Sequence, residues 1–533
     1  MEITIQSSHH NTSYKWLVLT LAIFFVFAHI KLSQYAFDDA YIHLRVARNL
    51  LETGTPYFNP NEAIKVGSSS GWILFLAVVL FPIRLIGIED NFPLFLSLVN
   101  AMISLFGMLI YTKIVERVLN HPLSGLRKFL FQASYLSMMA VSSIGLMETP
   151  LAVLLFGAGI YNLLKSHSSG FVWLGLAVYF RIELFIVAGM LGIFFAYREN
   201  FPPLKNIFLI GLGMLPFLLY DLYFFQTVIP NSIIAKSVVY SINGFYAFTR
   251  LVLFFFPRGL SYNELLSFSI GLVVILGVLI SIVGTAILTW KTDTGIWILI
   301  FGAWALLIIL GYLERRVLLF EWYAPLYTIP MFLAITLCAN VKEKSTNNFP
   351  LILQSALAAI YLLGLSQAFY ASTINPGVYE QFEIGSRVRN YIHAGRILNN
   401  AYPNSTLLSS EIGGLGYTFQ GYITDAAGLA SPDALDFHPM KIPEERARGD
   451  LGSIPPEYVE KIMPEFIVSY DHFASALLSS KVMERYSTIL IPAYFEQDIQ
   501  YARTKTIWGN EFLRIYIRKD LPVPDELIKL QIK

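Results

Sequence analysis

The sequence predicts a polytopic α-helical membrane protein that ends in a soluble α/β domain. Of its 533 residues, 55% are hydrophobic and 14% are charged, whereas a soluble domain typically carries about a quarter charged residues. Apolar runs long enough to cross a bilayer recur as far as Phe369. From about Ala371 the charge density rises, Pro and Gly recur, and no further run is long enough to cross. We therefore expect a membrane module over residues 1–370 and an extracytoplasmic α/β domain over residues 371–533.

The net charge, the cysteine content and the amino-terminal residues further restrict the class of protein. A net charge of +1 argues against a nucleic-acid partner. The single cysteine, Cys338, excludes an internal disulfide framework. The first apolar run, residues 16–32, is too long for the core of a cleavable signal peptide, so we expect it to remain as an anchor.

The apolar runs predict about eleven transmembrane helices, with surface and dipping helices in the first outer loop. We expect residues 72–88 to dip into the outer leaflet, because a full crossing there would spread the Lys and Arg clusters over both faces. With the amino end inside, these clusters face the cytoplasm. The polar residues described below as candidate site residues then share the opposite, outer face. The expected crossings are residues 16–32, 93–111, 129–146, 151–164, 171–180, 184–197, 207–225, 266–290, 295–311, 322–339 and 351–369.

The carboxyl-terminal stretch predicts a small α/β domain. Residues 382–400 have the periodicity of an amphipathic helix, and four short segments have the alternation or β-branched content of strands. These segments are residues 406–410, 422–425, 465–470 and 512–518. About 160 residues of this kind suffice for one compact domain.

An acidic pair, Asp38 and Asp39, directly follows the first span. The residues after it predict a surface helix that carries Arg45 and ends at Gly54. One Asp is an ordinary helix-start residue. Two adjacent carboxylates at a membrane boundary repel each other and need a metal, a basic partner or water. The pair therefore indicates a candidate site.

Charged residues also lie between apolar runs of the membrane module. Glu148 lies where one span ends and the next begins, and a helix-start acid is the alternative interpretation. Arg181 and Glu183 lie between two short apolar runs. They are interpreted either as a structural ion pair or as functional groups. Broken helices at membrane depth line enclosed or watery cavities.

Further candidates lie on the same predicted outer face. Asn231 and Lys236 follow a long span, in a stretch where Pro-Asn-Ser predicts a turn. Arg315 and Arg316 form a basic pair suited to a phosphate or pyrophosphate, with salt bridges to neighbouring glutamates as the alternative. Tyr323 is an interfacial aromatic residue on which a sugar can also stack.

Two acidic residues of the carboxyl-terminal domain, Glu411 and Asp425, end predicted strands within a Gly-rich stretch. This pattern is also that of ordinary tight turns. The chain has no Walker-type loop, HExxH, CxxC pair or GxSxG elbow.

Together these stretches resemble the GT-C glycosyltransferases, integral membrane enzymes that use polyprenyl-phosphate-linked sugars. The likeness is greatest to bacterial arabinofuranosyltransferases that add terminal β-1,2 arabinose. It runs in order from about Trp16 to about Asp433, and Ile182 departs from it where relatives have proline. The stretches that carry it are DDAYIHLRVARNLLETG, FNP, GSSSGW, LMETP, RIE, PNSIIAK, EIGGLGY and ITDAAGLASPD.

The resemblance implies inverting transfer of a sugar, for example a pentofuranose such as arabinose, from a polyprenyl phosphate to a glycan or glycolipid at the periplasmic face of the bacterial inner membrane. Asp38 or Asp39 would act as general base. Asp38, Asp39 and Glu148 would hold a divalent cation (Mg²⁺, Mn²⁺ or Ca²⁺), and no organic cofactor is implied. Glu411 and Asp425 would lie on the acceptor side. The donor phosphate and sugar would contact Arg45, Glu148, Arg181, Glu183, Asn231, Lys236, Arg315, Arg316 and Tyr323.

Two other classes fit parts of the pattern. A transporter or flippase for an anionic or lipid-linked substrate would also use broken helices, but it needs charges deep within the spans and access from both sides. A binding module on an inert anchor leaves the number of apolar runs and the one-sided charges unexplained.

Overall fold

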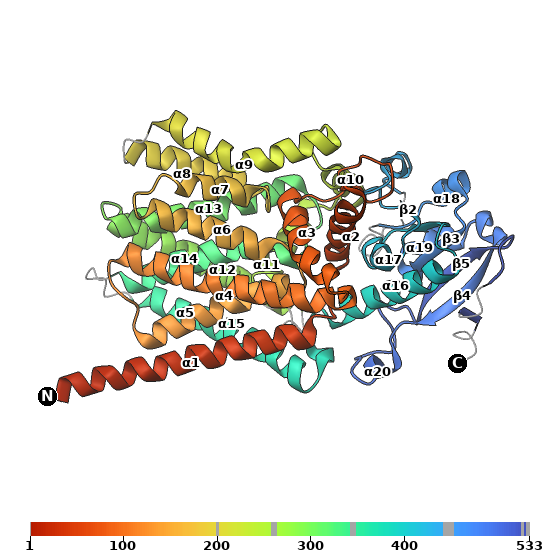
Figure 1. The fold of residues 1–533 in the computed structure, drawn as a ribbon. Helices are drawn as coiled ribbons and strands as arrows, with labels where there is room; N and C mark the ends of the chain where they lie inside the picture. The colour runs from red at the N-terminus through yellow and green to blue at the C-terminus, as the bar shows by residue number, and fades with distance from the viewer. Residues whose placement is uncertain are drawn as a thin grey trace. The chain divides into compact units, whose positions relative to one another are not determined.

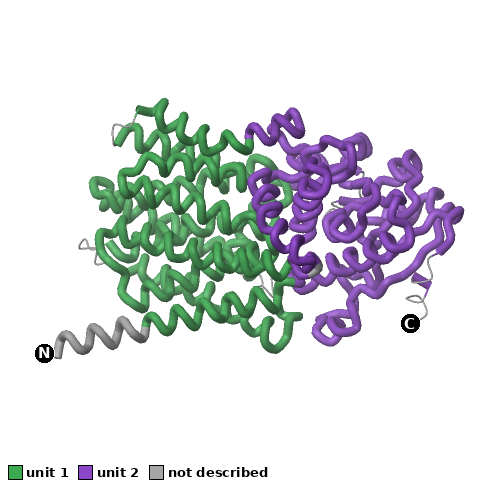
Figure 2. The backbone as a smooth tube through the Cα atoms, in the orientation of Figure 1, with its two compact units in different colours: residues 1–33, 93–217, 243–380 green, residues 34–92, 218–242, 381–533 purple. Residues whose placement is uncertain are grey.

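The computed structural model describes residues 2–198, 202–256, 264–341, 348–440, 452–523 and 527–528. The chain forms two compact units, each assembled from segments far apart in the sequence (Figure 2). Unit 1 comprises residues 1–33, 93–217 and 243–380, and unit 2 comprises residues 34–92, 218–242 and 381–533. The first predicted outer loop is therefore grouped with the carboxyl-terminal residues. The 370/371 domain boundary stays a prediction.

Unit 1 is built from helices, and every predicted crossing coincides with a helix (Figure 1). Its helices are α1 (Glu2–Leu32), α4 (Phe92–Leu119), α5 (Gly125–Ile144), α6 (Thr149–Leu163), α7 (Gly170–Val178), α8 (Leu184–Arg198), the first part of α9 (Pro203–Phe225), α11 (Gly244–Leu253), α12 (Glu264–Thr289), α13 (Asp293–Arg315), α14 (Pro325–Asn340) and α15 (Phe349–Thr373), with the 3-10 turns η3 (Glu321–Tyr323) and η4 (Pro376–Val378).

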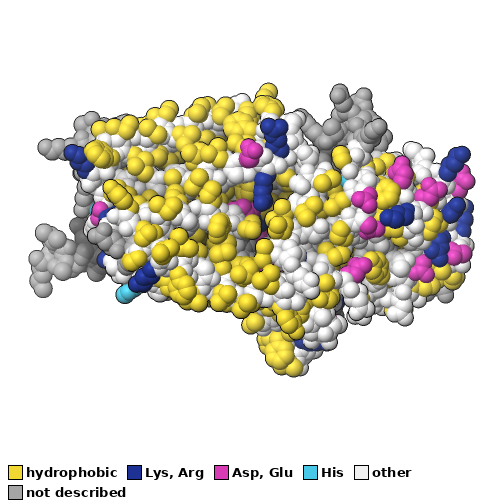
Figure 3. Space-filling view, turned by 90° about the horizontal axis from the view of Figure 1, so that it is seen from above, with side chains coloured by type: hydrophobic (Ala, Val, Ile, Leu, Met, Phe, Trp, Pro, Cys, Tyr) yellow, Lys and Arg dark blue, Asp and Glu magenta, His cyan; other side chains and the backbone are white. Residues whose placement is uncertain are grey.

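Within the described residues, 6 helices are long and apolar enough to cross a membrane. They are Tyr14–Leu32, Phe92–Leu119, Pro203–Phe225, Leu265–Thr289, Asp293–Arg315 and Phe349–Thr373. Hydrophobic side chains cover most of the face of unit 1 seen in Figure 3. The predicted polytopic helical architecture is confirmed, while the number of crossings, about eleven, stays a prediction because the remaining helices are shorter or less apolar.

The predicted break between two short apolar runs is also confirmed. Helix α7 ends at Val178 and α8 begins at Leu184, so Arg181 and Glu183 lie between them. The predicted turn at Pro-Asn-Ser is wrong, because helix α10 (Asn231–Val239) begins there in unit 2. Pro230 precedes the first turn as the N-cap residue with a φ of −71°. Its fixed φ and missing N–H are tolerated at a helix start, where the first N–H groups have no helical partner.

Unit 2 contains the helices of the first outer loop and the carboxyl-terminal domain. The surface helix predicted after the acidic pair is α2 (Asp38–Thr53), and Gly54 ends it with a φ of 74° and an N–H that donates to Leu50 O over 3.1 Å. The other helices and turns are α3 (Ser70–Leu85), η1 (Glu89–Asn91), the end of α9, α10, α16 (Phe382–Ala401), α17 (Gly413–Thr418), η5 (Pro432–Phe437), α18 (Pro456–Ile462), α19 (Asp471–Leu478), η7 (Lys481–Arg485) and α20 (Glu496–Ile499).

The sheet of unit 2 has the strand order β2-β1-β3-β5-β4. Its strands are β1 (Thr406–Ser409), β2 (Tyr422–Asp425), β3 (Phe466–Tyr470), β4 (Tyr486–Pro492) and β5 (Phe512–Arg518). Strand β1 pairs in parallel with β2 and β3, so β1 and β2 end together with Ser409 opposite Asp425. Strand β5 pairs antiparallel with β3 and β4. This register brings the Gly-rich segment after β1 and the turn after β2 to one edge of the sheet.

Candidate active site

The two carboxylates at the start of α2 have different surroundings within unit 2. The Asp38 carboxylate accepts hydrogen bonds from the N–H groups of Gly413, over 2.9 Å, and Gly414, over 2.7 Å. These N–H groups open helix α17, where they have no helical acceptor. Burial raises the pKa of Asp38, the two N–H groups lower it, and the neighbouring Asp39 charge raises it.

The close approach of the chain at Asp38 requires glycine. A Cβ on Gly413 would lie 1.9 Å from Asp38 O, and a Cβ on Gly414 would lie 2.7 Å from Val388 O. Both obstacles are backbone atoms, which cannot rotate away. The sequence is also compatible with an ordinary tight turn at this Gly-Gly pair. In the structure, Gly413 allows α17 to pack closely against α2, and Gly414 allows it to pack against α16.

Asp39 is partly exposed and faces a cation. Its Oδ2 accepts a hydrogen bond of 3.0 Å from Lys236 Nζ of α10, and 26% of the Asp39 side chain is accessible to solvent. The structure thus gives the pair two kinds of partner, backbone N–H groups for Asp38 and an ammonium for Asp39. Lys236, a residue expected to bind the donor, lies beside the carboxylate pair.

Glu411 lies two residues before Gly413 and pairs with Arg387 of α16. The Arg387 guanidinium stacks over the Trp508 ring, 3.9 Å from its centroid. Glu411 Oε2 is buried and has no hydrogen-bond partner within the described residues. Burial raises the pKa of Glu411 to about 8, although Arg387 lowers it, while the Asp38 charge raises it further.

Asp425 ends β2 and organises the turn that follows. Its Oδ1 accepts from the Ala427 N–H and its Oδ2 from the Ala430 N–H, each over 2.9 Å. Burial raises the pKa of Asp425 to about 7 against these hydrogen bonds. Both carboxylate oxygens therefore have backbone partners, as expected for an acid that shapes a tight turn.

Two residues expected to contact the donor form hydrogen bonds with backbone carbonyls of unit 2. Arg45 is buried and donates to the carbonyls of Phe58, over 2.8 Å, Phe419, over 2.5 Å, and Gly421, over 2.9 Å. Asn231 donates to the carbonyls of Gly428 and Leu429 over 2.7 and 2.8 Å. Their donors are used by backbone carbonyls of unit 2, which gives both residues a structural role, and a contact with the donor stays a prediction.

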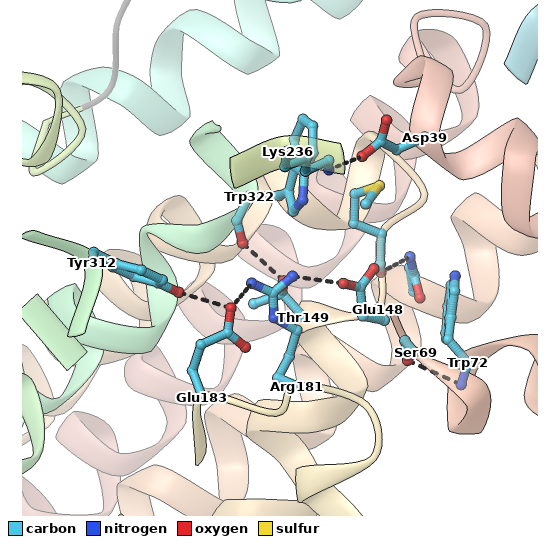
Figure 4. Close-up of polar contacts among 12 residues, drawn as sticks. Asp39, Ser69, Trp72, Glu148, Thr149, Arg181, Glu183, Lys236, Tyr312 and Trp322 are labelled. Atoms are coloured by element: carbon cyan, nitrogen blue, oxygen red, sulfur yellow. Dashed lines mark hydrogen bonds and ion pairs between the residues drawn. The ribbon is translucent and has the colours of Figure 1, made fainter. Parts of the chain in front are cut away.

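Unit 1 brings Glu148, Arg181 and Glu183 together (Figure 4), and Tyr323 lies against the Arg181 guanidinium. Arg181 donates to Glu148 Oε1 over 2.6 Å and to Glu183 Oε1 over 2.8 Å. The guanidinium lies 4.1 Å from the Tyr323 ring centroid, and the Tyr312 hydroxyl donates to Glu183 over 3.3 Å. Glu148 occupies the N-cap position of α6, yet its carboxylate does not cap the helix. One guanidinium between two carboxylates leaves a net charge of −1, which disfavours a phosphate.

Arg315 and Arg316 are exposed at the end of α13. In the part of the chain that the structure describes, neither forms an ion pair with Glu314 or Glu321, the alternative suggested by the sequence. Two exposed guanidinium groups that pair with no acid among the described residues remain suited to an anionic ligand.

A buried ionic network that the sequence did not predict lies in unit 2. Lys65 pairs with Asp221 of α9, whose other oxygen accepts from Ser70 Oγ over 2.5 Å. The Lys65 and Asp221 side chains are 5% and 0% exposed. Asp221 is the one acidic residue inside the apolar run 207–225, and an ionisable residue within a span is a signal that could have identified it.

The predicted metal site does not fit the described residues. No group of three or more His, Cys, Asp or Glu side chains there could hold a metal ion. Both Asp38 oxygens accept N–H groups, and Asp39 faces an ammonium, which competes with a cation. We therefore derive no step through a metal, and metal dependence stays a prediction.

Comparison with solved structures identifies the fold. The chain is similar to the crystal structure of ArnT from Cupriavidus metallidurans in the apo state, with a TM-score of 0.55 and 12% identity over 97% of this chain and 100% of that one. ArnT is a GT-C family glycosyltransferase. The polytopic GT-C fold with a carboxyl-terminal sheet domain, predicted from the sequence, is confirmed.

Comparison at the level of sequence matches only part of the chain. Residues 379–516 match a family described as "Domain of unknown function (DUF8728)". No curated protein matches the chain.

Proposed function

We propose that the protein is an inverting glycosyltransferase that moves a sugar from a polyprenyl-phosphate donor to a cell-envelope glycan or glycolipid. The reaction would take place at the periplasmic face of a bacterial inner membrane. The observation that carries this proposal is the Asp38–Asp39 pair at the start of α2, fixed by N–H groups and by Lys236, in a chain with the fold of ArnT. The sugar, with a pentofuranose such as arabinose as one candidate, is part of the proposal.

The chemistry follows from the charges around the pair. One carboxylate takes the proton of the acceptor hydroxyl while the hydroxyl oxygen attacks the anomeric carbon of the donor sugar. The bond from that carbon to the phosphate oxygen breaks, and polyprenyl phosphate leaves with the electron pair. A single displacement inverts the anomeric configuration. Lys236, whose ammonium donates a hydrogen bond to Asp39, can balance charge on the departing phosphate.

The test is transfer by the purified full-length chain from a panel of short polyprenyl-phosphate sugars to membrane-extracted glycans. We expect product from one donor, with the inverted anomeric configuration, and the comparison with and without EDTA measures metal dependence. No product from any donor, together with movement of the same lipids across liposome bilayers, would favour the transporter class instead.

A further inference from the structure

The carboxyl-terminal domain surrounds Asp38 with groups that no comparison assigns to a function. We infer that its segment from Glu411 to Gly414, fixed by Arg387, is a working part of the active site that orients the Asp38 carboxylate. Arg387 is in this view a positioning residue that acts through Glu411 and the Gly413–Gly414 N–H groups. The catalytic consequence of this inference depends on the proposed function, whereas the positioning itself does not.

The hydrogen bonds from Gly413 and Gly414 fix the geometry of the Asp38 carboxylate. Each Asp38 oxygen accepts one N–H, Oδ2 from Gly413 and Oδ1 from Gly414, so both the position and the rotation of the carboxylate are fixed. Hydrogen bonds to a charged acceptor are roughly twice as strong as neutral ones. Reacting groups that are held in the productive geometry save much of the entropic cost of a reaction.

Arg387 lies where it can hold this segment in place. It projects from α16, its side chain is 6% exposed, and it lies between Glu411 and the face of Trp508. The residue next to it, Val388, contributes the carbonyl against which Gly414 packs. The ion pair therefore fixes the segment two residues before the N–H groups that hold Asp38.

The Arg387 charge also offsets the acids around Asp38. A buried cation provides the largest electrostatic stabilisation where it offsets the charges of several acids in a medium of low dielectric constant. Arg387 lowers the pKa of both Asp38 and Glu411. The other titratable groups that interact with this cluster include Asp39 and Tyr41 of α2, Lys236 of α10, Tyr240 directly after α10, Tyr391 of α16, Asp425 of β2 and Tyr470 of β3.

The experiment compares R387Q and R387K in the full-length protein, with R485Q as the control at an exposed arginine of the same domain. We expect R387Q to lower kcat at least tenfold with little change in KM. We expect R387K, which keeps the charge, to recover most of that loss, and R485Q to behave like the wild type. A change in KM alone, or equal loss in R387Q and R387K, would overturn the inference.

A second measurement is independent of turnover. Hydrogen exchange of the peptide covering residues 411–417, without donor or acceptor, reports how firmly the N–H groups are held. We expect faster exchange in R387Q and in D38N, but not in R485Q. Unchanged exchange in both variants would contradict the positioning role. Absence of transfer by the wild type with faster exchange in the variants would contradict the proposed function alone.

Discussion

The Asp38 carboxylate accepts a hydrogen bond of 2.9 Å from the N–H of Gly413, a residue 375 positions further along the chain. This contact joins the first outer loop to the carboxyl-terminal domain within one compact unit. The acidic pair therefore depends on the carboxyl-terminal domain for its geometry, although the sequence separates the two by all the later membrane helices.

The close packing at Gly413 gives the first prediction. We expect G413A to lower transfer at least tenfold, because its Cβ would lie 1.9 Å from Asp38 O and must displace α17 from α2. The matched control is G211A in α9, where a Cβ meets nothing within 4 Å. Transfer rates and the elution profile of both variants on size exclusion check the prediction, and wild-type transfer by G413A would contradict it.

Lys236 gives the second prediction. K236Q removes the ammonium that lies 3.0 Å from Asp39 Oδ2. We expect a loss of transfer of about 10- to 1000-fold, on the scale of other charge-stabilising groups. K236R, which keeps the charge, should lose less. Initial rates at saturating donor measure the effect, and equal rates for K236Q and the wild type would exclude Lys236 from the chemistry.

The buried acids of unit 2 predict a pH dependence of stability. The pKa of Glu411 is raised from 4.5 to about 8 and that of Asp425 from 3.8 to about 7, mainly by burial. The folded state therefore binds protons that the unfolded state releases. This contribution to stability is complete below the unfolded values and is lost as the pH rises through about 7 to 8.

We accordingly expect the Tm of the full-length protein to fall between pH 5 and pH 8, over roughly the window in which such groups titrate. E411Q cannot ionise, so its Tm should fall less over the same window. The exposed acid Glu484 provides the control variant, E484Q. A Tm that rises with pH in the wild type would show that the direction is wrong.

The Lys65–Asp221 pair gives a prediction about stability alone. Both side chains are buried, so K65M or D221N leaves an uncompensated charge and should cost about 3–5 kcal/mol. The double variant removes both charges and should be less destabilised than the sum of the singles. Thermal unfolding can be followed with a thiol-reactive dye, because the single cysteine, Cys338, is buried. Additive effects would show that the two residues are not coupled.

The sequence predicted the elements whose signals are local. Every predicted crossing coincides with a helix, the helix after Asp38 ends at Gly54 as expected, and strand β5 spans residues 512–518. Strand β4 was missed. It pairs with β5 alone at one edge of the sheet, where the half-buried Ser487 and the exposed Thr488 weaken the hydrophobic pattern.

The contacts that depend on tertiary structure were not predicted. The pairing of Asp38 with Gly413 joins two segments that are far apart in the sequence, and sequence periodicity carries no information about such contacts. Arg387 gave a weak signal, since it lies four residues before Tyr391 on the buried face of α16. The resemblance implied that Arg45 contacts the donor. The sequence did not show that its guanidinium also bonds to backbone carbonyls, which need partners when buried.

The most direct test of the account is the release of polyprenyl phosphate by the D38N/D39N double variant, measured with the donor that the wild type uses. A general base contributes about 10²- to 10⁴-fold, so we predict a loss of at least 100-fold. The variant should still insert and elute as a folded protein. Release at the wild-type rate by a folded double variant would contradict the assignment of this pair to the chemistry.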